Sequence, residues 1–211
     1  MSPGAEGPVA GVVLAAGDAR RFGGPKLTMP FGSSTVLGCV VAALTGASVS
    51  PIIVVAGGNR PEIEAALSGS QARTITNPDP TRGMLSSVQV GVAALPQATL
   101  APQDVARFLI ALADQPRITA DGVRQLLDAH RGSGKGIALP THKGKRGHPV
   151  VFTARYRDEV LALDTDAALR DVIHRHLDDI AEIEFTSDAF VRDIDTQEQY
   201  EDERCKANAE R

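Results

Sequence analysis

The chain has 211 residues, of which 43% are hydrophobic, enough to bury the core of one domain. Its 22 Lys and Arg against 26 Asp and Glu give a formal charge of -4, which provides no general attraction to nucleic acid or to an anionic membrane. No apolar stretch approaches the ~20 residues of a membrane-spanning helix, and residues 1–8 lack the basic start and apolar centre of a secretion signal. We therefore expect a cytoplasmic protein that binds neither nucleic acid nor membrane.

Short apolar runs alternate with helical patterns along the chain. Runs rich in Val, Ile and Leu predict strands at 9–14, 52–56 and 107–113. Helical patterns predict helices at 35–45, 61–67 and 85–95. Nearly continuous apolar strands are typical of a parallel sheet that is buried on both faces. The alternation therefore predicts an α/β sandwich.

The second half continues this alternation. Helices are predicted at 119–130, 156–163 and 167–177, and a charged helix from Thr196. Strands are predicted at 137–140, 149–152, 180–185 and 190–194. There is no internal repeat and no linker long enough to divide the chain. Because ligands of open parallel sheets bind beyond the carboxyl ends of the strands, the residues that follow each strand are the ones to search for chemistry.

The first such place is the segment 15–26, which contains Gly17, Gly23 and Gly24. Small residues let backbone N–H groups approach phosphate oxygens, and the three cations Arg20, Arg21 and Lys26 could neutralise a triphosphate. The segment matches neither the dinucleotide-binding pattern nor the Walker pattern. The alternative is a glycine-rich turn with solvated arginines.

The second place is the turn-rich segment 77–88, which runs into a helix. Gly83 permits close approach of a ligand to the backbone, and Ser86 and Ser87 place hydroxyl groups in the first helical turn. This helix start could contact a nucleobase or a phosphate. The alternative is a helix that is capped by its own serines.

Two carboxylates follow predicted strands far apart in the sequence. Asp114 ends the run at 107–113, and Asp195 follows the run at 190–194. Mg²⁺ usually binds through one or two carboxylates together with substrate phosphates, so both residues are candidate metal ligands. The alternatives are a turn-forming Asp114 before Pro116 and an Asp195 that caps the following helix.

The loop 143–149 concentrates positive charge in an otherwise acidic chain. It contains Lys143, Lys145, Arg146 and His148, and it could hold an anionic co-substrate. The alternative is an exposed basic loop in which His148 is a structural hydrogen-bonding residue.

These motifs together resemble the MobA-like nucleotidyltransferase superfamily, and most closely its molybdenum cofactor cytidylyltransferase branch. The resemblance runs from about Val9 to Tyr200. The motifs that carry it are Leu14-Ala15-Ala16-Gly17, Arg21-Phe22-Gly23, Lys26, Gly83-Met84 with Ser86-Ser87, 112–116, Arg146-Gly147-His148-Pro149 and 193–196.

The resemblance implies a Rossmann-like three-layer sandwich with a mostly parallel central sheet, of the nucleotide-diphospho-sugar transferase type. It implies one nucleotidyltransferase domain at 9–200, with a flexible N-terminus at 1–8 and a charged tail at 201–211. The implied reaction transfers CMP from CTP to the phosphate of molybdopterin, with Mg²⁺, and releases pyrophosphate. The Leu-Ala-Ala-Gly form of the first loop favours CTP over GTP, and a molybdoenzyme would receive the product.

The resemblance also implies roles for individual residues. Arg21, Lys26 and Asp114 would be catalytic, Asp114 and Asp195 would hold the metal, and Arg146, Gly147 and His148 would border the co-substrate. The residues implied in nucleotide binding are Leu14, Ala15, Ala16, Gly17, Arg21, Lys26, Gly83 and Ser87.

The chain departs from the family pattern in two places. The family usually has Ser where this chain has Ala19, and a Gly-Asp-x-Gly-like loop is common where this chain has residues 164–170. These departures keep two alternatives open. One is a transferase that uses GTP or another NTP and a sugar phosphate or other small phosphorylated acceptor. The other is a non-catalytic cofactor- or partner-binding protein of the same fold.

Overall fold

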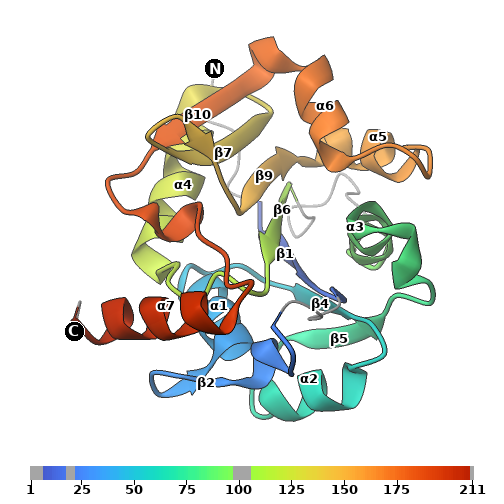
Figure 1. Cartoon of the computed structure of the whole chain (residues 1–211). Coiled ribbons are helices and arrows are strands. Elements are labelled where there is room, and N and C mark those ends of the chain that lie inside the picture. The colour runs from blue at the N-terminus through green and yellow to red at the C-terminus, as the bar shows by residue number, and fades with distance from the viewer. Residues whose placement is uncertain (1–6, 18–21, 97–105, 210–211) are drawn as a thin grey trace.

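The computed structural model describes residues 7–17, 22–96 and 106–209 and contains a central mixed sheet (Figure 1). The strand order is β10-β7-β9-β6-β1-β4-β5, and β8 pairs with β7 at one side. The strands are β1 (Val9–Ala15), β4 (Ile52–Ala56), β5 (Arg73–Thr76), β6 (Arg107–Leu112), β7 (Ile137–His142), β8 (Lys145–Arg146), β9 (Val150–Thr153) and β10 (Ile180–Glu184). The predicted α/β fold with a mostly parallel sheet is confirmed.

Most strands run in one direction. β1 pairs in parallel with β4 and β6, β4 with β5, and β7 with β10, whereas β9 is antiparallel to both β6 and β7. β7 therefore points the same way as β6, and the carboxyl ends of β1, β4, β5, β6, β7 and β10 meet at one edge of the sheet. This carboxyl edge carries the residues that the sequence singled out.

Helices cover both faces of the sheet and complete three layers. One core cluster packs the first face against α1 (Val36–Gly46), α2 (Arg60–Ala66), α4 (Ala120–Ser133) and α7 (Gln197–Ala209). The other cluster packs the opposite face against α3 (Met84–Ala93), α5 (Arg157–Leu161) and α6 (Leu169–Arg175). Figure 1 shows α3, α5 and α6 on one side of the strands and α1 and α4 on the other.

Local chemistry explains where the helices begin and how closely they approach the sheet. The hydroxyl groups of Thr35 and Thr119 accept hydrogen bonds from the N–H groups of Gly38 and Gly122, which caps α1 and α4. A Cβ atom at Gly91 would lie 2.3 Å from a methyl group of Val12. Glycine is therefore needed there for α3 to lie against β1, and the start of α3 comes to the carboxyl edge as a result.

Three pairings escaped the sequence patterns, one of which is the short β8 against β7 in the loop predicted at 143–149. β5 is an edge strand with only intermediate and exposed residues, so it lacks the apolar run by which buried strands are recognised. The hairpin of β2 (Pro30–Phe31) and β3 (Ser34–Thr35) is too short to show a period. Each remaining predicted element has a counterpart, with bounds that shift by a few residues, except for one strand.

The strand predicted at 190–194 is wrong. The chain forms the 3₁₀ helix η5 (Asp188–Phe190) and then an irregular segment at 191–196. Its backbone groups bond to loops, because the Phe190 carbonyl oxygen accepts from the His148 N–H at 2.9 Å and the Ile194 N–H donates to the Asp114 carbonyl oxygen at 3.0 Å. Phe190 and Ile194 are buried, which gave the segment the apolar pattern of a strand.

The charged helix expected from Thr196 is confirmed as α7. The Thr196 hydroxyl accepts from the Gln199 N–H, as a capping residue does. The helix continues through the charged residues from 201 to 209, and its Glu203 is only 2% exposed. The charged end of the chain is thus packed onto the domain through 203.

Candidate active site at the carboxyl edge of the sheet

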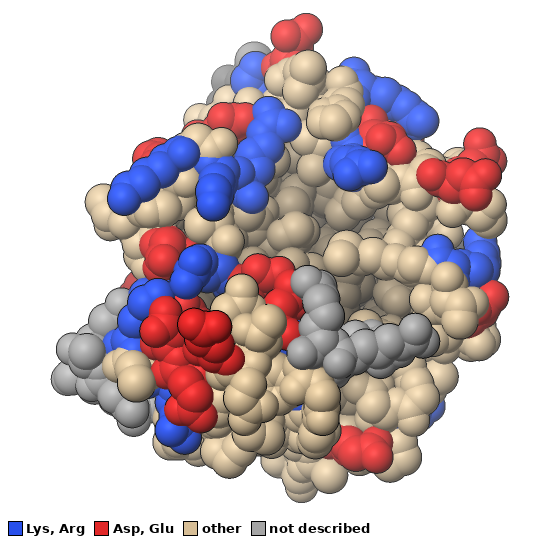
Figure 2. All heavy atoms as spheres, in the orientation of Figure 1, with Lys and Arg blue, Asp and Glu red and all other residues tan. Residues whose placement is uncertain are grey.

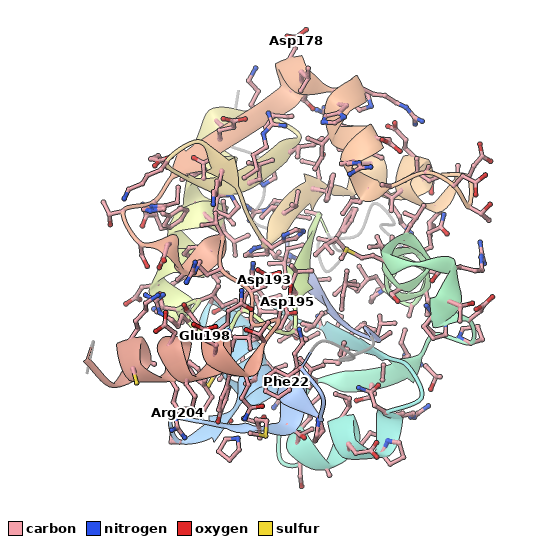
Figure 3. The ribbon with its side chains drawn as sticks, in the orientation of Figure 1. Phe22, Asp178, Asp193, Asp195, Glu198 and Arg204 are labelled. Carbon is pink, nitrogen blue, oxygen red and sulfur yellow. The ribbon has the colours of Figure 1, made fainter. Side chains whose placement is uncertain are left out.

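Three carboxylates converge at the carboxyl edge. Asp114 follows β6, while Asp193 and Asp195 belong to the segment 191–196 before α7. One oxygen of each lies within 4.8 Å of the other two. Figure 3 shows Asp193 and Asp195 side by side near the centre of the molecule. The structure thus brings the two predicted metal ligands together and adds Asp193 to them.

Asp193 was not named as a candidate metal ligand, because only the residue after the predicted strand end was considered. A strand would place residues 193 and 195 on one face, so the strand prediction did not exclude Asp193. The Asp-x-Asp spacing itself was the available signal. In the structure the segment is irregular, and the carboxylates of Asp193 and Asp195 both lie close to the carboxylate of Asp114.

Lys26 connects these acids. It begins the 3₁₀ helix η1 (Lys26–Thr28), and its ammonium group donates to the Asp114 carboxylate at 2.6 Å and to the Ile194 carbonyl oxygen at 2.5 Å. The Asp195 carboxylate lies 3.5 Å from the same nitrogen. The Lys26 side chain is 13% exposed, so its charge is only partly screened by water. A predicted catalytic cation and predicted metal ligands therefore form one cluster.

The electrostatics of the cluster favour an added cation. Burial raises the pKa of Asp114 above its usual 3.8, the charge and hydrogen bond of Lys26 oppose this, and the negative charge of Asp193 raises the pKa further. Three carboxylates at this spacing offer the oxygen ligands that Mg²⁺ and Mn²⁺ prefer. The residues at the site thus fit a divalent cation, which would offset the repulsion between the acids.

A first cleft of about 410 Å³ opens beside this cluster. Its walls come from the loop after β1, from η1 and from the start of α2. They include Ala16, Gly17, Gly24, Pro25, Lys26, Thr28, Gly58, Asn59, Glu62 and Pro80. Ala16, Gly17 and Lys26 were predicted to bind nucleotide and line this cleft. Arg21, predicted as catalytic, and Ala19 lie outside the described residues.

The segment before α3 combines an open backbone with buried hydroxyl groups. Gly83 has φ +86°, a conformation that favours glycine, and directly precedes α3. Ser86 and Ser87 are each 5% exposed, and both hydroxyl oxygens accept hydrogen bonds from the Asn77 side-chain amide, at 2.8 and 2.9 Å. Ser87, predicted to contact the nucleotide, lies beneath the surface and fastens α3 to the segment after β5.

A second cleft of about 570 Å³ lies on the other side of the end of β1. Its floor is apolar and includes Leu14, Val88, Ile110, Leu139 and Val150. Its walls carry Arg82, Arg146, His148, Arg170 and His174. Figure 2 shows a hollow in this face with Lys and Arg gathered along its upper rim and Asp and Glu gathered below it.

The predicted co-substrate residues Arg146, Gly147 and His148 line this second cleft, as does the predicted nucleotide-binding pair Leu14 and Gly83. Ala15 is buried at the end of β1. Burial lowers the pKa of His148 to about 4, although the negative charge of Asp193 works in the opposite direction, so the imidazole is neutral near pH 7. The unusual segment 164–170 also contributes to this cleft through residues 165–170.

The family model described as the MobA-like NTP transferase domain matches residues 11–180, most of the chain. The chain belongs to this family.

Curated relatives of this MobA-like chain carry different names. Nicotine blue oxidoreductase of Paenarthrobacter nicotinovorans is 29% identical over 198 residues, which cover 90% of this chain and 94% of the relative. Molybdenum cofactor cytidylyltransferase of Escherichia coli K12 is 25% identical over 190 residues, which cover 90% and 92%. The two names describe different reactions.

Solved structures share the MobA-like fold. A nucleotidyl transferase from Methanothermobacter superposes with a TM-score of 0.81 at 22% identity over 97% of this chain and 99% of its own. Rv0371c of Mycobacterium tuberculosis superposes with a TM-score of 0.79 at 23% identity over 94% and 98%. A second structure of Rv0371c is a complex with manganese, with a TM-score of 0.71, 23% identity, and coverage of 93% and 97%.

Among the described residues of this MobA-like protein, none of the helices is both long and apolar enough to cross a membrane.

Proposed function

We propose that this protein is a Mg²⁺-dependent cytidylyltransferase that transfers CMP from CTP to the phosphate group of molybdopterin. The observation that carries the proposal is the contact of Lys26, which lines the first cleft, with Asp114 and Asp195. Leu14 lines the second cleft and Ala16 the first, and the Ala113 N–H donates to the Leu14 carbonyl oxygen at 3.2 Å. Asp114 therefore follows directly beside the boundary between the clefts.

The reaction needs positioning and charge more than a protein nucleophile. An oxygen of the acceptor phosphate forms a bond to the α-phosphorus of CTP, and the bond from that phosphorus to the bridging oxygen breaks, so pyrophosphate leaves with that oxygen. A phosphate monoester is already largely deprotonated near neutral pH, so no side chain has to remove a proton. The protein aligns the two phosphates and offsets negative charge at the α-phosphate.

The residues present divide these tasks. Lys26 lines the first cleft, where backbone N–H groups of the loop after β1 and its own ammonium group would hold the triphosphate. Asp114, Asp193 and Asp195 would hold the divalent cation, which neutralises phosphate charge when it is bound. Support for the metal comes from Rv0371c, a protein of the same fold whose structure was solved with manganese.

The second cleft suits a phosphorylated acceptor with a flat ring system. Its apolar floor would pack against the flat face of a ring, and Arg82, Arg146 and Arg170 on its walls would attract phosphate. The relative from Escherichia coli named molybdenum cofactor cytidylyltransferase supports molybdopterin as that acceptor and CTP as the donor. The departure at 164–170 lies on this cleft, which keeps another phosphorylated acceptor as the alternative within the same chemistry.

A pyrophosphate-release assay tests the proposal. Purified protein is incubated with Mg²⁺, with molybdopterin, and with ATP, CTP, GTP or UTP in turn. We expect release with CTP that depends on molybdopterin and on Mg²⁺. Release with another NTP would show that the protein is a nucleotidyltransferase with a donor other than CTP. If molybdopterin is not the acceptor, labelled CTP is incubated with cell extract, and the product that carries the label identifies the acceptor. Tight binding of nucleotide or cofactor with no turnover on any acceptor would favour a non-catalytic binding protein.

A second candidate function follows from the relative named nicotine blue oxidoreductase, which matches nearly the whole chain at 29% identity. In that case the protein would catalyse a redox reaction on a small molecule instead of a nucleotidyl transfer. Loss of NADH or NADPH absorbance on addition of a redox dye, without release of pyrophosphate from any NTP, would favour this function over transfer.

A further inference from the structure

The proposed metal site is assembled from two separate pieces of chain. Asp114 ends β6, whereas Asp193 and Asp195 belong to the irregular segment 191–196. Backbone groups of the segment make several bonds around the site: the Ile194 N–H donates to the Asp114 carbonyl oxygen, and the Ile194 carbonyl oxygen accepts from the Lys26 ammonium group. The N–H groups of Asp195 and Thr196 donate to the Gln199 side chain of the adjacent helix. The spacing of the carboxylates therefore depends on what holds this segment against the end of β6.

Arg117 lies where it can hold the segment 191–196 against the end of β6. It follows Asp114 by three residues, in the turn that joins β6 to α4, and its side chain is 6% exposed. One guanidinium nitrogen donates to the Asp188 carboxylate at 2.8 Å and to the Glu203 carboxylate at 3.0 Å. Asp188 begins η5, just before the segment, and Glu203 lies on α7, just after it. A single side chain thus binds both flanks of the segment to the turn that carries Asp114.

Arg117, Asp188 and Glu203 form a network of ion pairs, and the burial of Arg117 and Glu203 restricts how these side chains can be arranged. Glu203 is 2% exposed and is also approached by the Arg192 guanidinium at 3.5 Å and the Lys206 ammonium at 3.1 Å. Exposed ion pairs contribute little, but a buried arginine with planar donors fixes the direction of its partners. Figure 3 shows Asp193 and Asp195 just above the first turns of α7, the helix that this network anchors.

We propose that Arg117 is a positioning residue that sets the spacing of Asp193 and Asp195 relative to Asp114, and thereby the affinity for the divalent cation. The inference rests on the proposed metal-dependent transfer. Loss of a residue that orients metal ligands typically lowers metal affinity by ~10- to 100-fold. Arg117 acts in this scheme through the Asp188 and Glu203 carboxylates, which lie on the two flanks of the segment.

The experiment titrates Mn²⁺ into protein with the nucleotide that the wild type binds, and reads bound Mn²⁺ by electron paramagnetic resonance against protein-free nucleotide. Arg117→Lys keeps the charge but loses the planar donors. The double variant Arg117→Met with Glu203→Gln removes the pair together, so that no buried carboxylate is left without its arginine. The matched control is Arg155→Met, which removes an arginine–aspartate pair with Asp179 at the opposite edge of the sheet.

We expect the dissociation constant for Mn²⁺ to rise about tenfold or more in both Arg117 variants and to stay unchanged in Arg155→Met. In turnover assays the Mn²⁺ concentration for half-maximal rate should rise, while kcat recovers at saturating Mn²⁺. A general loss of stability would instead lower kcat at every metal concentration. Melting temperatures are recorded for each variant.

Unchanged Mn²⁺ affinity in a folded Arg117 variant overturns the inference, and so does an equal loss in Arg155→Met. If both Arg117 variants fail to fold, Asp188→Asn removes one of the two flanking contacts at a carboxylate that is 33% exposed, and unchanged affinity there overturns the inference as well. A wild-type protein that binds no Mn²⁺ with any nucleotide overturns the proposed function too, whereas normal wild-type binding with unaffected variants overturns only the role of Arg117.

Discussion

The two clefts at the carboxyl edge differ in the residues that line them. The first, of about 410 Å³, is lined by Gly17, Gly24 and Gly58 and by side chains that include Lys26, Asn59 and Glu62. The second, of about 570 Å³, has an apolar floor and walls of arginine and histidine side chains. Backbone groups recognise a feature that many ligands share, such as a phosphate, whereas side chains distinguish one ligand from another. The first cleft therefore suits the common donor and the second the particular acceptor.

The largest expected effect comes from Asp114, which follows β6 and contacts Lys26 beside the first cleft. Asp114→Ala should lower kcat by at least ~100- to 1000-fold, because a preorganised charged group beside the reacting phosphate is lost. Pyrophosphate release measures this, and circular dichroism with the melting temperature checks that the fold persists. A variant that retains more than about a tenth of the wild-type rate would remove Asp114 from the site.

Lys26→Met affects the first cleft and should lower turnover by roughly 100-fold, because the ammonium group no longer offsets phosphate charge. The same variant should bind Mn²⁺ more tightly than the wild type when nucleotide is absent, since Lys26 no longer competes for Asp114 and Asp195. Titration of Mn²⁺ without nucleotide measures the second effect. Weaker binding in the variant would show that Lys26 supports the metal site rather than competing with the metal.

A change confined to the second cleft should separate acceptor from donor. Arg146→Gln is expected to raise the KM for the acceptor about tenfold, as loss of one charge-assisted hydrogen bond does, with the KM for the nucleotide unchanged. Lys145→Gln, at an exposed neighbouring position on β8, is the control. Equal changes in both KM values would mean that the two clefts do not hold separate substrates.

The smallest expected effect concerns stability and pH. Folding lowers the pKa of His148 from 6.5 to about 4, so the unfolded chain binds more protons than the folded protein between these values. The free energy of unfolding should therefore decrease as the pH falls from about 6.5 to about 4, and His148→Gln should make this decrease shallower.

Urea denaturation at about pH 7 and about pH 5 compares the two proteins. Part of the decrease should remain in the variant, because burial also lowers the pKa of His130. An identical decrease in wild type and variant would show that His148 stays accessible to protons in the second cleft.

The sequence patterns succeeded where burial is strong and local. The runs that became β1, β4 and β6 are apolar on both faces, and their carboxyl ends pointed to Lys26 and Asp114 as site residues. The patterns failed where a segment is buried but does not pair as a strand, or pairs as a strand but is not buried. The segment at 190–194 has buried Phe190 and Ile194 but no strand partner, and β5 has a strand partner without a buried face.

The sequence by itself determined the α/β layers, the glycine-rich loop after β1 and the carboxylates at 114 and 195, because residue period and composition are local properties. The tertiary structure decided that Asp193 joins those carboxylates, that Ser87 is buried against Asn77, and that Arg117 binds both flanks of the segment 191–196. These relations join residues that are distant along the chain, and they arise only when β6, η5 and α7 pack together.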